Sequence, residues 1–526
     1  MKTSPSWFQE SHLPLALKWM LCSRQDLMAH EFHLEGRERQ FLQWLVRTGF
    51  QEYPALAARI EREVELNEWF REESELGNGL SRIELAIWDT CKLHRKCCRL
   101  PGLAQLYHLW LKLFWPANRR SLPKRNVFFE RSAKNLEPLQ ETTRPFGVNL
   151  IGYATYALGV GEDLRTTYHA LEANAVPTTV IDFAPGDRDR ARELSLQSHL
   201  SREAPYSFTL LCMTAEETAR YVLYQGTEHL EGRYIIGYWP WELENWPDEW
   251  IPLLDLVNEV WVSTHHIAMG LRAATSKPVQ VMPLCVDSPD PELRALDSQQ
   301  RTSIRDRFVL PEKDILFFFS FDLDSSIERK NPWGALTAFQ RAYPHSDSAN
   351  EHPNVGLVIK TFSPKQANAS WEELKEIAAA DPRIRIVEAN LSRFELLSLM
   401  GACDALLSLH RAEGFGRGLA EALKLGLDVI ATDWSGNTDF CSGHLAHPVP
   451  YELVPVPPGA YPFHKGQRWA EPDLDAAADI IRSVVEKRAS AAPDQEWTGA
   501  DYADQFSMKT CGARYRSRLE ELHQIQ

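Results

Sequence analysis

The sequence predicts an α/β protein in which an all-α segment precedes two doubly wound domains, each built on a parallel sheet. Three observations carry this prediction. Short apolar runs alternate with helical stretches in two successive series, a proline-rich polar linker at 287–302 separates them, and residues 1–125 show helical periodicity only. Because 526 residues exceed what one hydrophobic core supports, we expect at least two domains.

The composition is typical of a globular cytoplasmic protein. Apolar residues make up 44% of the chain and charged residues 25%. A formal net charge of −15 argues against general nucleic-acid binding. Nine cysteines without a paired framework fit a reducing compartment. We expect neither a signal peptide nor a membrane span, since no apolar run approaches the roughly 20 residues that cross a bilayer.

The N-terminal segment at 1–125 is expected to be a helical domain. Apolar residues recur at three-and-four spacing, which predicts helices at 13–28, 37–47, 54–73, 80–95 and 103–114. A group of possible metal ligands lies within it, at Cys91, His94, Cys97 and Cys98. Their spacing fits no common zinc pattern, so we predict buried thiols and no metal.

The end of this segment has two interpretations. An aromatic, leucine-rich stretch at 103–115 precedes Arg119-Arg120 and Lys124-Arg125, and a basic linker follows at 126–144. The stretch 103–125 could lie on an anionic membrane surface, as a peripheral contact, or receive a lipid-linked molecule. The other interpretation, which we favour, is a core helix followed by a solvated linker.

The first α/β domain is expected at 145–290. Strands are predicted at 146–151, 178–183, 207–213, 234–238, 259–262 and 279–282, with helical stretches between them. Gly159 and Gly161 fall in a loop before a helix at 162–174. They do not complete a dinucleotide fingerprint, and they fit a tight structural turn as well as a ligand loop.

Two features of this domain are candidates for ligand contact. Trp239, Trp241 and Trp246 follow the fourth strand together with Glu242. Exposed rings there would suit stacking on a sugar, but an aromatic plug under a loop is an equal alternative. His265 begins the next helix, where Ser263 or Thr264 fits a helix cap; a histidine facing a cleft is the second interpretation.

The second α/β domain is expected at 300–500. Strands are predicted at 315–320, 355–361, 384–387, 405–409 and 429–432, and helices at 332–342, 371–380, 393–401, 418–425 and 473–488. An amphipathic helix at 506–522 lies in the terminal segment, 501–526.

The stretch 408–426 is the most informative part of the sequence. A strand, a turn with three glycines and a helix follow one another, so a helix N-terminus lies at the carboxyl end of a strand. Free N–H groups and the helix dipole favour a phosphate there. Glu413 and Glu421, separated by seven residues, flank this position and suit hydroxyl groups on either side of the phosphate. A nucleotide sugar has that layout.

The composite pattern His410-x-x-Glu413-Gly-Phe-Gly-x-Gly-x-x-Glu421-Ala resembles the E-x7-E signature of the group 1 retaining glycosyltransferases. The resemblance implies a GT-B fold, with two Rossmann-like domains facing a cleft and a terminal helix that packs back on the first. It also implies that Glu413 contacts donor-sugar hydroxyls and Glu421 the ribose. Backbone N–H groups around Phe415, Gly416 and Arg417 would reach the diphosphate, with Gly159 and Gly161 approaching the donor phosphate or the acceptor.

The same family places a basic pair after the first strand of its second domain, where this chain has Arg329 and Lys330. By resemblance these side chains hold the diphosphate and stabilise the charge that grows on it. Many relatives have an additional arginine close to the first strand of this domain. Lys360 closes the next strand and could supply that positive charge instead. The pair Asp322-x-Asp324 looks like a metal motif, but we predict that it structures a loop and that no metal is essential.

The resemblance implies a retaining hexosyltransferase that needs no cofactor. It would use a nucleotide sugar and a glycan or lipid-linked acceptor in surface polysaccharide biosynthesis. Many relatives have a sugar-facing histidine where this chain has Trp241 and Glu242, so that role does not carry over. Two alternatives remain: a non-catalytic sugar- or lipid-surface-binding protein on the same scaffold, and a phosphorylase or epimerase.

Overall fold

The computed structural model describes most of the chain outside the segment at 87–143. The described residues are 5–11, 13–34, 37–53, 56, 64–72, 81–83, 85–86, 144–184, 193–287, 296–311, 314–323, 326–344, 354–362, 369–490, 499, 502 and 504–525. Three expectations therefore lie outside them: the cysteine and histidine group at 91–98, the helix with its basic neighbours at 103–125, and the linker at 126–143. Asp324 lies outside them as well.

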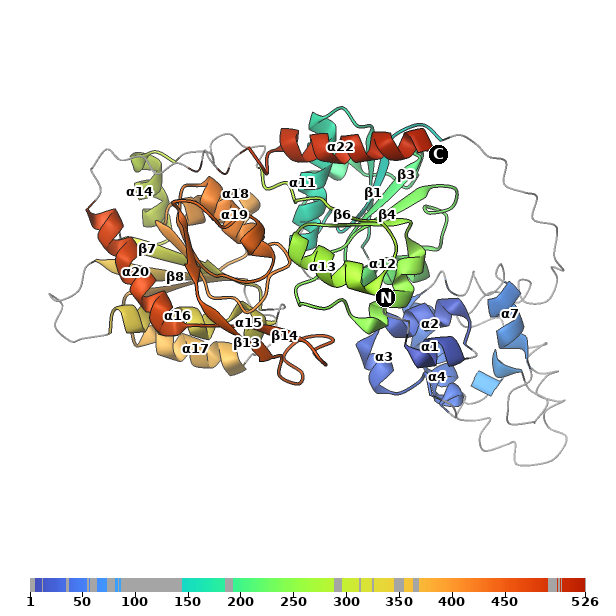
Figure 1. The fold of residues 1–526 in the computed structure, drawn as a ribbon. Coiled ribbons are helices and arrows are strands. Elements are labelled where there is room, and N and C mark those ends of the chain that lie inside the picture. The colour runs from blue at the N-terminus through green and yellow to red at the C-terminus, as the bar shows by residue number, and fades with distance from the viewer. Residues whose placement is uncertain are drawn as a thin grey trace.

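The first sheet has six parallel strands in the order β2-β1-β3-β4-β5-β6 (Figure 1). Every residue of β1 and β3 is buried, as apolar strands covered on both faces should be. All six predicted strands are confirmed within two residues at each end. We call this sheet and its helices the first domain. Its strands are β1 Val148–Gly152, β2 Thr178–Asp182, β3 Phe208–Cys212, β4 Tyr234–Tyr238, β5 Glu259–Val262 and β6 Val279–Val281.

The second sheet also has six parallel strands, in the order β12-β11-β10-β7-β8-β9. The five predicted strands are present, and β12 was not predicted. We call this sheet and its helices the second domain. Its strands are β7 Ile315–Ser320, β8 Val355–Thr361, β9 Ile384–Glu388, β10 Ala405–Ser408, β11 Asp428–Thr432 and β12 Ala446–Val449.

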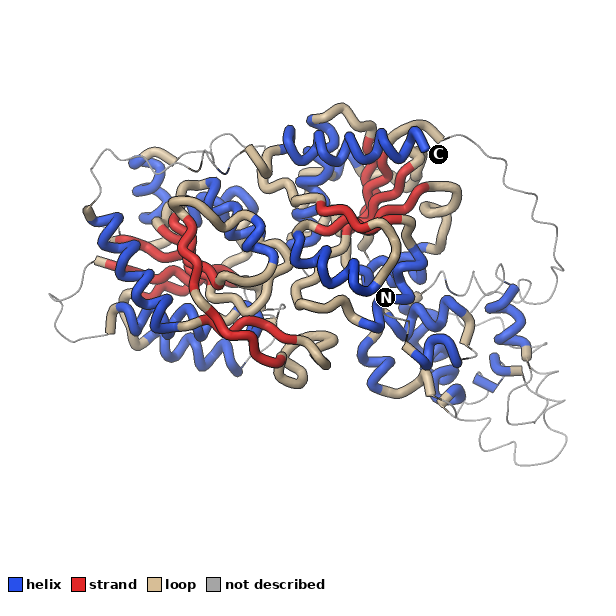
Figure 2. Tube along the Cα trace, in the orientation of Figure 1, coloured by secondary structure: helices blue, strands red, loops and turns tan. Residues whose placement is uncertain are grey.

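Helices cover both sheets (Figure 2). In the first domain they are α11 Gly159–Ala173, α12 Ala215–Gln225, α13 His265–Ala274 and the 3-10 segments η2 Gln197–His199 and η3 Asp248–Leu256. In the second they are α14 Ser298–Arg307, α15 Ile327–Lys330, α16 Pro332–Ala342, α17 Ala369–Ala379, α18 Arg393–Gly401, α19 Arg417–Lys424, η5 Gly436–Asp439 and α20 Leu474–Ala489. The helix predicted at 162–174 starts earlier, so Gly159 and Gly161 lie in its first turn and not in a loop.

A hairpin that the sequence did not predict extends from the second domain. Strands β13 Tyr451–Pro455 and β14 Arg468–Pro472 pair antiparallel, and their turn spans 456–467. Figure 1 shows this hairpin leaving the second domain on the side that faces the first. The three prolines within its turn made the segment look like an irregular loop.

The N-terminal helices pack on the first domain. Trp19 and Cys22 of α2 belong to the hydrophobic cluster of that domain, and α2 contacts α12 and η3. The helix predicted at 13–28 is broken at Ser23 and Arg24. The helix predicted at 37–47 is an α-helix to Trp44 and continues as a π-helix from Leu45. The elements are α1 Ser6–Glu10, α2 Leu15–Cys22, α3 Gln25–Ala29, α4 Glu38–Trp44, η1 Leu45–Gly49, α5 Phe50–Glu52 and α7 Val64–Arg71.

The terminal helix α22, Met508–Ile525, lies along α11 of the first domain (Figure 1). Gly512 permits this contact, because a Cβ there would come within 1.9 Å of the Ala170 carbonyl oxygen. The Tyr515 hydroxyl donates to the Pro283 carbonyl at 2.7 Å. Among the described helices, none combines the length and the apolar character needed to cross a membrane.

Candidate active site

The candidate site lies at the carboxyl edge of the second sheet. The chain runs from β7 outward through β8 and β9, then returns to β10 on the other side of β7. The loops after β7 and β10 therefore diverge from a topological switch point, the usual ligand site of an open parallel sheet. Several hydrogen bonds join these loops. Among them, the Arg411 N–H donates to the Arg329 carbonyl at 2.8 Å, and the Asn331 amide donates to the Leu409 carbonyl at 2.8 Å.

The short helix α15 sets the position of the basic pair. Ser326 caps it by accepting the Arg329 N–H at 3.1 Å. Asn331 ends it in the left-handed region, with φ 54°, and its side chain accepts the Gly334 N–H that starts α16. Pro332 occupies the first position of that helix, where its missing N–H is not needed. These local signals place Arg329 and Lys330 against the loop that follows β10.

Glu413 lies between the two cations. Its Oε1 is 2.5 Å from the Lys330 ammonium, and its Oε2 is 3.3 Å from Arg329 Nη1. Only 8% of Glu413 is exposed. Burial opposes its charge, but Lys330 and Arg329 outweigh burial and lower the pKa of Glu413 to about 2. The structure thus brings together the three residues predicted to be catalytic.

The turn before α19 is held by close backbone approaches. Gly416 is the N-cap, with φ 88° in the left-handed region. A Cβ on Gly436 would come within 1.9 Å of the Gly414 carbonyl oxygen, and a Cβ on Gly414 within 2.6 Å of the Trp241 carbonyl oxygen. The Glu413 N–H donates to Ser435 Oγ at 2.9 Å. The glycines therefore fix the direction in which Glu413 points.

His410 stabilises this turn through hydrogen bonds of its buried ring. It is fully buried, and burial lowers its pKa, so the ring is neutral near pH 7. Its Nδ1 is 3.0 Å from Ser408 Oγ and its Nε2 is 3.0 Å from Asn437 Oδ1. The Asn437 amide in turn donates to the Thr432 carbonyl at 2.9 Å. His410 thus links the end of β10 to Asn437 within the motif.

Arg417 and Glu421 belong to a second, cross-domain cluster. Arg417 donates to Asp163 of α11, at 2.9 Å from its Nε, and to the Cys285 carbonyl at 3.0 Å. Glu421 is 5% exposed and pairs with Arg393 of α18. Arg393 also contacts Glu162 of α11 at 3.1 Å. Both acids of the E-x7-E pattern are therefore buried and paired, and neither faces bulk solvent.

The sequence did not point to Glu162, Asp163 or Arg393. Arg393 follows Ser392 in an ordinary capping box, which is a structural signal only. Burial opposes the charge of Glu162, but Arg393 and Arg165 lower the pKa of Glu162 to about 2. Gly161 allows α11 to lie close to the backbone of Tyr153 and Tyr156, because a Cβ at this position would be 2.6 Å from both of their carbonyl oxygens. A Cβ on Gly159 would meet nothing within 4 Å.

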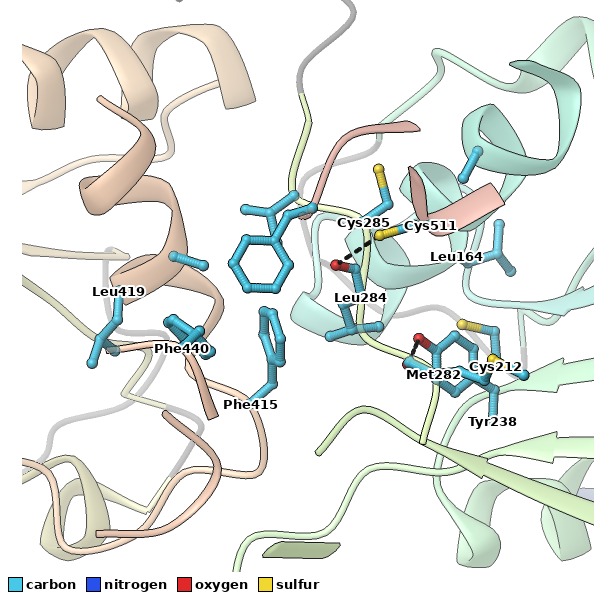
Figure 3. Close-up of a cluster of buried hydrophobic side chains, with 14 of the residues drawn as sticks. Leu164, Cys212, Tyr238, Met282, Leu284, Cys285, Phe415, Leu419, Phe440 and Cys511 are labelled. Atoms are coloured by element: carbon cyan, nitrogen blue, oxygen red, sulfur yellow. Dashed lines mark hydrogen bonds between the residues drawn. The ribbon is translucent and has the colours of Figure 1, made fainter. Parts of the chain in front are cut away.

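Phe415 joins the two domains through its side chain. Its ring lies 5.0 Å from that of Phe440 and 5.6 Å from that of Phe506, which precedes α22. Figure 3 shows Phe415 on the loop before α19, between Leu419 and Phe440 on one side and Leu284 and Cys285 on the other. Its backbone remains at the helix N-terminus, where the donor diphosphate was expected.

Trp241, Glu242 and His265, the residues weakly predicted to contact a ligand, differ in their placement. Trp241 is 3% exposed, with its Nε1 donating to the Asn245 carbonyl at 2.8 Å and its ring 5.0 Å from Trp250. Of the two equal interpretations, this burial supports the aromatic plug and contradicts an exposed stacking surface. His265 is exposed on α13, whose cap is Thr264, and its Nδ1 lies 3.0 Å from Asp439. Only Glu242 approaches the cluster, 3.9 Å from Arg329.

Lys360 is a buried cation at the end of β8. It is 2% exposed, and its ammonium lies 3.8 Å from the centre of the Phe362 ring. Burial lowers the pKa of Lys360 to about 8, although Asp322 opposes the shift. Because β8 neighbours β7, this lysine is at the same sheet edge as the basic pair.

Comparison with solved structures identifies the architecture. HepE from Anabaena, solved with UDP and glucose, is 13% identical with a TM-score of 0.50, over 72% of this chain and 100% of HepE. Sucrose-phosphate synthase from Thermosynechococcus elongatus is 14% identical with a TM-score of 0.51, over 72% and 100%. A glycosyltransferase from Rickettsia africae gives 14% and 0.51, over 72% and 98%. The sequence matches no protein-family model and no curated protein.

At these identities the likeness concerns the fold. The two six-stranded parallel sheets, each covered by helices, have the same arrangement in this chain and in these proteins. The chain therefore has the GT-B fold, with two Rossmann-like domains, as the sequence predicted.

Proposed function

We propose that the protein is a glycosyltransferase that uses a nucleotide diphosphate sugar. The observation that carries this proposal is the cluster of Glu413, Arg329 and Lys330 beside the N-terminus of α19, at the switch point of the second sheet. HepE, of the same fold, was solved with UDP and glucose, which is the ligand chemistry that such a cluster suits.

In this proposal the donor diphosphate lies on Arg329, Lys330 and the first N–H groups of α19. Glu413 then accepts hydrogen bonds from hydroxyls of the transferred sugar. Ribose hydroxyls would share Glu421 with Arg393. Lys360 adds a further positive charge at the same edge. The cations supply the charge that the leaving group requires, so we propose no essential metal.

The transfer forms one bond and breaks one. The acceptor hydroxyl oxygen bonds to the anomeric carbon while the bond from that carbon to the diphosphate oxygen breaks. The electron pair leaves with the nucleoside diphosphate, whose charge Arg329 and Lys330 stabilise. The hydroxyl proton passes to a phosphate oxygen on the same face, which retains the anomeric configuration. We propose a hexose as the transferred group, and a glycan or lipid-linked glycan of a surface polysaccharide as the acceptor.

Slow hydrolysis of the donor tests this function without knowledge of the acceptor. Wild-type protein should release free sugar from at least one of UDP-glucose, UDP-N-acetylglucosamine, GDP-mannose and ADP-glucose. Glu413→Gln should reduce the rate about ten- to a hundredfold, the value of one or two charge-assisted hydrogen bonds. Glu471→Gln is the matched control, since Glu471 pairs with Arg411 outside the cluster.

The rival functions predict other results. A non-catalytic binding protein would bind these ligands and release no sugar from any of them. A phosphorylase would need free phosphate, and an epimerase would convert the nucleotide sugar without any acceptor.

A further inference from the structure

The hairpin of β13 and β14 closes on the first domain beside the proposed donor site. The backbone N–H of Asn245 donates to Gln467 Oε1 at 3.0 Å, and the Gln467 amide donates back to the Asn245 carbonyl at 2.7 Å. Arg468 pairs with Glu244 at 2.8 Å. The ring of Phe463 lies 5.4 Å from that of Trp250. The buried tryptophans of the first domain are therefore the surface on which the hairpin rests.

Tyr461, at the tip of the hairpin, reaches the charged cluster. Its hydroxyl donates to Glu242 Oε2 at 2.6 Å, and its ring centre lies 5.6 Å from the Arg329 guanidinium. The neighbouring Ala460 carbonyl accepts from Ser326, the cap of α15, at 2.9 Å. Tyr461 thus connects an acid of the first domain to the helix that carries the basic pair.

Arg329 lies between two carboxylates that come from different domains. Glu413 of the second domain is 3.3 Å from its Nη1, and Glu242 of the first domain is 3.9 Å from its Nη2. A diphosphate on Arg329 would compete with both acids for the guanidinium. Both carboxylates would then face the sugar attached to that diphosphate, as hydrogen-bond acceptors with negative charge.

We propose that Glu242 is a specificity-determining residue of the donor-sugar site and that Tyr461 positions it. Two carboxylates accept hydrogen bonds from hydroxyl or ammonium groups and repel a third carboxylate. The site therefore takes donors whose sugar is neutral or carries an amino group, and it rejects uronic acids. This inference rests on the proposed function.

The role of Glu242 can be tested with pairs of donors that differ only at C6 of the sugar. Dissociation constants are measured by calorimetry for UDP-glucose and UDP-glucuronic acid, and for GDP-mannose and GDP-mannuronic acid, with UDP and GDP alone as probes of the diphosphate site. In the pair whose neutral member binds, wild-type protein should bind the nucleotide uronic acid at least about tenfold more weakly than the neutral nucleotide sugar. Equal affinities would overturn the inference while leaving the proposed function intact.

Variants of Glu242, Tyr461 and Glu244 distinguish a direct role of Glu242 in sugar recognition from a structural role. Glu242→Gln should bring the two affinities together, and Tyr461→Phe, which keeps the ring over Arg329, should do so in part. Glu244→Gln removes a charge from the same loop and from the same hairpin contact, and it should leave the ratio unchanged. A ratio that stays constant in Glu242→Gln would overturn the inference, because a merely structural role changes both affinities equally. ADP is measured in the same way, and failure of UDP, GDP and ADP all to bind would overturn the proposed function and this inference with it.

Discussion

Glu413, Arg329 and Lys330 are site residues that could be predicted from the sequence. Arg329 and Lys330 lie 83 residues or so from Glu413 in sequence, yet the family resemblance indicated that they meet, and the structure brings them together. Their roles in the reaction stay predictions. Residues without a motif, such as Arg393 and Tyr461, could not be found, because their partners are set by packing between distant segments.

Lys330→Met should weaken diphosphate binding. The substitution removes one charge-assisted contact and leaves Arg329 as the partner of Glu413 in the cluster, so the dissociation constant for the nucleoside diphosphate should rise about ten- to a hundredfold. Calorimetry with UDP and GDP measures it. Lys375→Met, on an exposed pair of α17, is the control. Equal affinity in wild type and Lys330→Met would exclude this lysine from the site.

Lys360 should make diphosphate binding depend on pH above about 8. Its pKa is lowered to about 8 by burial, so the free protein loses this charge as the pH rises through that value. A diphosphate held by Lys360 prefers the charged form, and its affinity should fall at higher pH. Lys360→Arg should remove the dependence. A wild-type affinity that stays constant from pH 7 to about 9.5 would exclude Lys360 from the site.

The same lysine predicts a stability change that needs no ligand. Between pH 8 and 10.5 the unfolded chain binds more protons at Lys360 than the folded chain does, so the free energy of unfolding should rise with pH across that window. Denaturation in urea at several pH values measures the slope. Lys360→Met should lose this part of the rise, and identical slopes in the two proteins would contradict the lowered pKa.

At the scale of elements, the turn between β10 and α19 depends on glycine. Gly436→Ala would place a Cβ 1.9 Å from a backbone oxygen that cannot move alone, so the turn, the direction of Glu413 and donor binding should all be lost. Gly418→Ala is the matched change: a Cβ there meets nothing within 4 Å inside α19, and it should be neutral or stabilising. Thermal denaturation and calorimetry compare them. Equal behaviour of the two variants would contradict this role of the turn.

Other elements show what local patterns could not predict. The sheet strands were predicted closely because buried parallel strands are continuous apolar runs. The hairpin of β13 and β14 was missed, because its strands are short and half-exposed and its turn contains prolines. Trp241 was interpreted as a possible surface residue, but two of the rings that cover it, Tyr461 and Phe463, come from this hairpin.

At the scale of the whole molecule, buried charge joins the two domains. Arg417 pairs with Asp163, Arg393 with Glu162, and Lys424 with Asp287 at 2.9 Å, each across the domain boundary. The sequence predicted two sheets but not these pairs, because their members are separated by more than 100 residues. Removing one member leaves the other buried with one ion-pair partner fewer, which is unfavourable.

Asp163→Asn should therefore loosen the contact between the domains. Arg417 would lose its nearest acid and keep Glu421 at 3.9 Å, so an arrangement with the two domains further apart should become more populated. Small-angle X-ray scattering should give a larger radius of gyration than for wild type. Asp475→Asn, at an exposed pair with Arg341, should leave it unchanged. An unchanged radius in Asp163→Asn would show that the pair of Arg417 and Asp163 is not needed to hold the domains together.

The most direct measurement is a crystal structure of the protein with a bound nucleotide sugar. The account predicts the diphosphate within hydrogen-bond distance of Arg329, Lys330 and the N-terminus of α19, with the sugar on Glu413 and the ribose on Glu421. A ligand bound elsewhere, with the ion pairs of Glu413 intact, would contradict it.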